Sequence, residues 1–96
     1  MNVAFDGETV TPLIPSGVLD RDVISAVLWF YGLPEGVESG SFMNALMTAF
    51  VKADRENFDR LEQGFPIVGY WVRALKNDPD GTTRAVIALQ MIRAQS

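Results

Sequence analysis

The chain contains no cysteine and no histidine. Without cysteine there are no disulfides, thiolate nucleophiles or soft metal ligands, so the fold has to be stable through packing alone. Without histidine, the side chain that titrates closest to neutral pH and the commonest metal ligand are both missing. These absences exclude the usual catalytic triads and zinc sites. We therefore expect no metal site, no cofactor and no enzymatic activity.

Runs of positive charge and long apolar runs are also missing. Eight lysines and arginines stand against twelve acidic residues, for a net charge of −4, and no basic stripe is present to follow a phosphate backbone. The most apolar stretch, residues 23–34, is far shorter than the about 20 residues that span a membrane. No charged start leads into an apolar segment with a cleavage site. We expect a cytoplasmic protein that binds neither nucleic acid nor membrane.

The 96 residues, 48% hydrophobic and 21% charged, are enough for one domain over residues 1–96. Its first part, residues 1–16, differs from the rest. Asp6-Gly7 between short apolar runs is typical of a tight hairpin turn, and Pro12 and Pro15 disfavour a helix after it. This segment is expected to be a small hairpin or an extended arm.

The rest of the chain has the apolar spacing of helices, so the predicted fold class is all-α, a compact bundle of about five short helices. The ends of the helices follow from local signals: the acids Asp20 and Asp22 in a first turn, Ser41 and Asp54 as caps, Gly64 at a stop, and Pro66 in a first turn. The predicted helices cover residues 19–31, 41–53, 54–63, 66–76 and 83–94.

For two of these helices, the sequence predicts which residues lie on the buried face and which on the solvent face. The segment 41–53 places its large apolar residues at the spacing of one buried face: Phe42, Met43, Leu46, Met47, Phe50 and Val51. The segment 54–63 is charged, with only Phe58 and Leu61 inward. Its i, i+4 spacing predicts two ion pairs on the solvent side, Arg55 with Asp59 and Glu56 with Arg60.

Paired carboxylates remain as a possible source of acid–base chemistry. The candidates lie in first turns, in loops or on the charged face, where capping or solvation is the expected role, because a perturbed acid needs an apolar cleft. They are Asp20 with Asp22, Glu35 with Glu38, and Asp59 with Glu62.

The aromatic residues are the most informative feature. Helices 19–31 and 83–94 are apolar on several faces, which is more than so short a chain can cover, and surplus tryptophan and tyrosine are typical interface anchors. The candidate interface residues are Trp29, Phe30, Tyr31, Phe65, Tyr70 and Trp71. A symmetric homodimer or a foreign protein partner could cover them.

Part of the chain resembles a known group of proteins. The residues that carry the similarity are Ser41-Phe42 through Leu46, Ala53-Asp54, Asn57, Arg60-Leu61, Gly64-Phe65-Pro66 and Val68. Through these residues, the chain is similar to small uncharacterised proteins of actinobacteria and their phages. The resemblance covers residues 41–75. It implies that the chain is a phage accessory protein that acts inside a bacterium. It assigns no activity to the chain.

Two functions fit these observations. The first is a non-enzymatic interaction module, expected to form a homodimer, that binds and modulates a host or phage protein. The alternative is a structural or assembly component of a phage particle, in which the segment 1–16 exchanges between subunits.

Overall fold

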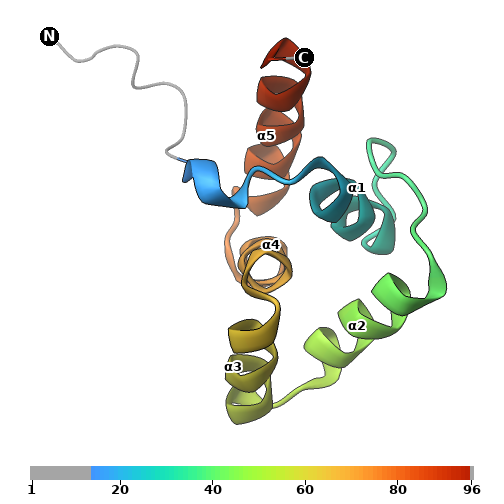
Figure 1. Ribbon diagram of the computed structural model, residues 1–96, viewed down its shortest axis with the longest axis vertical. Coiled ribbons are helices and arrows are strands. Elements are labelled where there is room, and N and C mark those ends of the chain that lie inside the picture. Colours follow the sequence, from blue (N-terminus) through green and yellow to red (C-terminus); the bar gives the residue numbers. More distant parts are fainter. Residues whose placement is uncertain (1–13, 96) are drawn as a thin grey trace, which may run out of the picture.

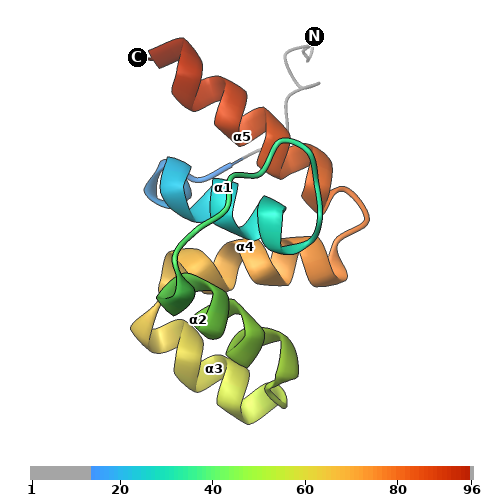
Figure 2. The ribbon, with the colours of Figure 1, turned by 90° about the vertical axis from the view of Figure 1, so that its right-hand side faces the viewer.

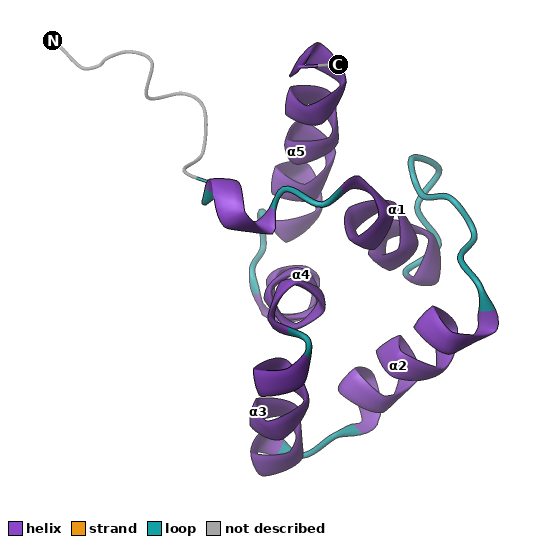
Figure 3. Ribbon diagram, in the orientation of Figure 1, coloured by secondary structure: helices purple, strands orange, loops and turns teal. Residues whose placement is uncertain are grey.

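The computed structural model describes residues 14–95 and shows an all-α bundle (Figure 1), as the sequence predicts. Figure 3 shows helices and connecting loops throughout the described part of the chain, with no strand. The predicted hairpin or arm lies outside the described residues except for its last three, residues 14–16. The elements are a 3₁₀ helix, η2 (Ser16–Val18), followed by α1 (Arg21–Phe30), α2 (Ser41–Lys52), α3 (Arg55–Gly64), α4 (Pro66–Asn77) and α5 (Gly81–Gln95).

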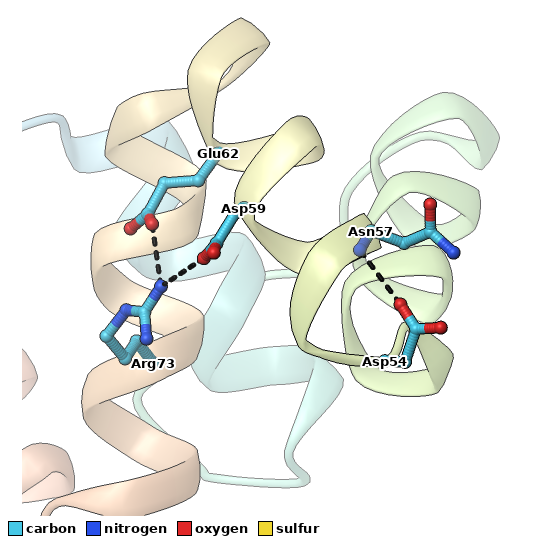
Figure 4. A network of polar contacts seen from close by, with 5 residues as sticks. All are labelled: Asp54, Asn57, Asp59, Glu62 and Arg73. Carbon is cyan, nitrogen blue, oxygen red and sulfur yellow. Dashed lines mark hydrogen bonds and ion pairs between the residues drawn. The ribbon is translucent and has the colours of Figure 1, made fainter.

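The helix ends follow local capping chemistry. The carboxylate of Asp20 accepts a hydrogen bond from the backbone N–H of Val23 (3.2 Å), and that of Asp54 accepts one from Asn57 (2.9 Å; Figure 4). Pro66 occupies the first turn of α4, where its missing N–H costs nothing. After α1 the chain turns at Gly32, whose φ of 78° is a conformation that glycine adopts without strain.

The predicted cap at Ser41 is wrong. Gly40 holds the capping position of α2, with extended backbone and no side-chain hydrogen bond, while Ser41 is already the first helical residue. A capping side chain works only from a residue outside the helical conformation, so Ser41 comes one position too late. Ser39, two residues earlier, donates its hydroxyl hydrogen to Oδ1 of Asn44 at 3.3 Å.

Helix α4 lies at the centre of the bundle. It packs against α1, α2, α3, α5 and η2. In Figure 1 it is seen almost end-on, with α1 and α5 above it and α2 and α3 below, and Figure 2 shows the same layers from the side. The buried core takes side chains from all five α-helices, and its largest fully buried members are Trp71, Phe50, Ile24, Leu28, Met47, Val27 and Val72.

The turn between α4 and α5 is held by one polar cluster. The carboxylate of Asp78 accepts a hydrogen bond from the backbone N–H of Asp80 (2.9 Å), and it forms an ion pair with Arg84 (2.5 Å). Arg84 also donates a hydrogen bond to the hydroxyl of Tyr70. The N–H of Asp80 first, and then Arg84, lower the pKa of Asp78 from its ordinary value of 3.8.

A pH-dependent contribution to stability follows from Asp78. Because its pKa is lower in the folded state, Asp78 stabilises that state above about pH 3.8, and the contribution disappears as the pH falls through the folded-state pKa. The Asp78→Asn variant should be less stable than the wild type near neutral pH, and the two should converge in strong acid. Thermal unfolding followed by circular dichroism over a pH series measures this difference.

Asp80→Asn is the matched control. It removes a neighbouring carboxylate that forms no ion pair with any residue between positions 14 and 95. A difference between the wild type and Asp78→Asn that is the same at every pH would contradict the role assigned to this carboxylate.

Candidate functional site

Trp71 does not belong to an interaction surface. Its side chain is 0% exposed, in the middle of the face of α4 that meets the core. The indole N–H of a buried tryptophan needs a hydrogen-bond acceptor, and here it donates to the backbone carbonyl of Val18 at 2.8 Å. Since α4 is covered by other elements on several sides, Trp71 has no route to a partner, and its selection as an interface residue is corrected.

Tyr70 and Phe30 are also engaged inside the molecule. Both are half-buried and pack against the core. The ring of Tyr70 meets Trp71 edge-on, with centroids 4.9 Å apart, and its hydroxyl is bonded to Arg84. The ring of Phe30 meets Tyr31 edge-on at 5.8 Å. These two side chains therefore offer a partner only part of their surface.

Trp29 and Tyr31 do reach the surface, at the end of α1. Each is 37% exposed. Partial burial raises the pKa of Tyr31, so its hydroxyl is a neutral hydrogen-bonding group at physiological pH. Gly36 lies against the backbone of Trp29 so closely that a Cβ there would be 2.1 Å from the Trp29 nitrogen. Because Trp29 and Tyr31 are two residues apart, they point to different sides of the helix end, and we call the exposed part of Trp29 the α1-end surface.

Phe65 lies on a second surface, together with a residue that sequence reasoning placed in the core. Phe65 is 38% exposed, and its ring is in contact with that of Phe42, with centroids 6.1 Å apart. Phe42 is 65% exposed. Figure 2 shows why these rings meet: the beginning of α2, the end of α3 and the beginning of α4 converge there. We call this pair, Phe42 and Phe65, the aromatic corner.

The prediction that Phe42 and Val51 face inward is therefore corrected. The centre of the apolar stripe of α2 is buried as predicted, at Leu46, Met47 and Phe50. Phe42 and Val51 lie at the two margins of that stripe and at opposite ends of the helix, and both are exposed. Their position at the edges of the stripe is the signal in the sequence that could have indicated exposure.

The charged face of α3 is organised by Arg73 of α4 (Figure 4). The guanidinium of Arg73 lies 2.7 Å from Glu62 and 3.5 Å from Asp59, and its carbon is 4.6 Å from the centroid of the Phe58 ring. The hydrogen bond that Arg73 donates to the Glu62 carboxylate raises the pKa of Arg73. The predicted pair of Glu56 with Arg60 is confirmed at 2.8 Å.

The other predicted pair, Arg55 with Asp59, does not form, because Arg73 reaches Asp59 from the neighbouring helix. A contact between helices of this kind cannot be read from the i, i+4 spacing within one helix. Asp59 and Glu62 therefore share one cation, an arrangement that stabilises the contact between α3 and α4. Such exposed ion pairs contribute modestly, about 0.2–1 kcal/mol each.

The remaining carboxylates have structural or solvent-facing positions. Asp20 is the cap of α1, and Asp22, Glu35 and Glu38 are exposed. Among residues 14–95, no three carboxylates come together as ligands for a metal ion. The geometry thus provides two apolar surfaces and a charged helix face.

No helix between residues 14 and 95 combines the length and the apolar character that are needed to cross a bilayer.

Comparison with known proteins adds no further assignment: no protein-family model, curated protein or solved structure matches the chain. The fold therefore defines the class, an all-α bundle organised around a central helix. Among the aromatic residues between positions 14 and 95, the two of the aromatic corner, Phe42 and Phe65, have the largest exposed fractions.

Proposed function

We propose that the protein is a non-enzymatic protein–protein interaction module that binds its partner through the aromatic corner. The observation that carries this proposal is the exposure of Phe42 and Phe65 in mutual contact at the surface. Neither chain segment that forms the corner, 39–51 or 63–72, contains a charged residue. An uncharged aromatic pair is typical of the centre of an interface, where charged residues are depleted.

Binding at the corner would be favourable for a simple energetic reason. Covering a phenylalanine side chain that is otherwise in water contributes about 1.5–3 kcal/mol in proportion to the area removed from water. The two rings already contact each other, so little side-chain freedom remains to be lost when a partner covers them. Phe42 has the larger exposed fraction, so covering its side chain would contribute the larger share of the binding free energy.

The biological setting comes from the resemblance of residues 41–75 to proteins of actinobacteria and their phages. We propose an accessory protein that acts in the bacterial cytoplasm by modulating a host or phage protein. Both residues of the corner, Phe42 and Phe65, belong to the resembling segment.

A photo-crosslinking amino acid at position 42 tests the proposal. The ring of the crosslinker replaces that of Phe42 at the surface, so the fold should be retained. After illumination in an actinobacterial lysate, we expect one dominant product larger than the free chain, identified by mass spectrometry. A second change, Phe65→Ser, should weaken that capture by about tenfold or more, as expected for a central interface residue.

Val37 supplies the matched control. It is 64% exposed, close to the 65% of Phe42, but lies in the loop before α2. The same crosslinker at position 37 should give no such product. Equal capture from both positions, or none from position 42, would refute the aromatic corner as the binding surface.

Self-assembly is the second candidate function, and one observation favours it. Residues 14–95 present two different exposed aromatic surfaces, the aromatic corner and the α1-end surface. When one such surface contacts a different surface on the next copy, the contact does not close on itself and builds rings or filaments. This arrangement suits a structural or assembly component of a phage particle.

Sedimentation at increasing protein concentration distinguishes the two functions. An assembly component should form oligomers larger than a dimer as the concentration rises. A monomer or a closed homodimer at all concentrations would exclude it, and a crosslinked product of two chains from position 42 would indicate the homodimer.

A further inference from the structure

A cavity of about 230 Å³ lies between the first turns of α3 and the last turns of α4, at the opposite end of α3 from the aromatic corner. Its lining includes Arg55, Arg73 and Lys76, and a single carboxylate, that of Asp59. The whole chain has only eight basic residues and a net charge of −4. Three cations from two helices thus converge at one cavity of a chain whose overall charge is negative.

Two of the three cations have no ionic partner. Arg73 is held by Glu62 and Asp59, but Arg55 and Lys76 form no ion pair within residues 14–95. The ring of Phe58 lies beside the group, 4.6 Å from the guanidinium carbon of Arg73 and 6.0 Å from Nζ of Lys76. The ring forms one wall, and a ligand in the cavity would meet the three cations and the single carboxylate of Asp59 on the others.

The size and charge of the cavity define the ligand. Its volume is below the about 300 Å³ at which sites for drug-sized molecules begin, so it suits a single compact group. Two unpaired cations match a phosphate, which carries a charge of about −1.5 to −2 at pH 7, better than they match a carboxylate. Arg55 adds a planar set of donors suited to phosphate oxygens, and the Asn77 side chain adds a further donor.

We propose that this cavity is a binding site for a phosphate group, carried by a small molecule or by a phosphorylated side chain. The site shares no residue with the aromatic corner, and it stands whether or not the proposed protein-binding function is correct.

Titration of the ¹⁵N-labelled full chain with inorganic phosphate, at constant ionic strength, tests the proposal by NMR. We expect saturable shifts confined to the amides of the first turns of α3 and the last turns of α4. Arg55→Gln and Lys76→Gln should each weaken binding by about three- to fivefold, the range of an exposed ionic contact. Arg21→Gln, the same charge change on α1 outside the cavity, should leave the affinity unchanged.

A pair of acidic substitutions on α3 gives the reverse effect. Asp59→Asn removes the carboxylate from the lining and should tighten phosphate binding by about two- to fivefold. Glu56→Gln changes the net charge equally on the same helix but outside the cavity, and should have no effect. Equal effects of Asp59→Asn and Glu56→Gln, or shifts that never saturate, would reduce the observation to general charge attraction and overturn the site.

Two further ligands complete the test. Acetate should bind more weakly than phosphate, and equal affinity would contradict a phosphate site. A short phosphoserine peptide that binds at least tenfold more tightly than inorganic phosphate would identify a phosphorylated protein as the source of the group. Equal affinities of peptide and inorganic phosphate would support a phosphate-bearing small molecule.

Discussion

Trp71→Ala is expected to lower the free energy of unfolding by about 3–5 kcal/mol, the range for truncating a buried aromatic side chain. Trp71 is 0% exposed and is among the largest side chains in the core. The substitution would leave a cavity at the centre of the bundle and remove the hydrogen bond that anchors η2 to α4 through the Val18 carbonyl. Such a loss is a large part of the about 5–15 kcal/mol that stabilises a typical domain. Urea denaturation followed by circular dichroism measures it.

Trp71→Phe separates the two contributions of this side chain. It keeps most of the apolar volume and removes the indole N–H, so the expected loss from the missing hydrogen bond is about 1–3 kcal/mol, depending on whether water reaches the Val18 carbonyl. Trp29→Ala, at the surface, should cost clearly less than Trp71→Ala. If Trp71→Ala and Trp29→Ala were equally destabilising, the position of Trp71 at the centre of the core would be wrong.

Gly81→Ala is expected to destabilise the protein by about 1–3 kcal/mol, the usual cost of forcing extra volume into a packed site. Gly81 is buried at the start of α5, and a Cβ at this position would lie 2.0 Å from the carbonyl oxygen of Ala74. That oxygen belongs to backbone, so the helices would have to move apart. Without the clash, the same change would favour a helix, since alanine is the better helix former by about 1 kcal/mol.

Gly64→Ala is the control with the opposite expected sign. Gly64 is the last residue of α3, it has no positive φ, and its Cβ would meet no atom within 4 Å. We expect this variant to be unchanged or up to about 1 kcal/mol more stable. A Gly81→Ala protein as stable as the Gly64→Ala protein would show that α4 and α5 are not in close contact at Gly81. Thermal unfolding of both variants provides the comparison.

Much of the fold could be predicted from local chemistry. The cap at Asp54, the proline at the start of α4 and the apolar stripe of α2 each depend on neighbours within a turn or two. Interactions of that range can be read directly from the sequence. The start of α5 was missed by two residues, at Gly81 instead of Thr83, because glycine is a poor signal for a helix start.

The candidate site was harder to predict, because exposure depends on which helices meet. An aromatic residue at helical spacing is compatible with core and with surface, and only the central position of α4 decides that Trp71 is buried. The exposure of Phe42 likewise depends on how the beginning of α2 meets the junction of α3 and α4, where Phe65 contacts it. The bridge from Arg73 to Asp59 joins two helices and has no counterpart in the spacing of either one.

The two tryptophans of the chain differ in a way that is useful in the spectrometer. Trp71 is enclosed by the core, whereas Trp29 is partly in contact with water at the end of α1. A quencher dissolved in the buffer therefore reaches the indole of Trp29 and not that of Trp71 while the chain is folded. Fluorescence that resists quenching reports on the integrity of the core, and the quenchable part reports on what approaches the α1-end surface. One unlabelled chain thus carries two separate optical signals, one for folding and one for association.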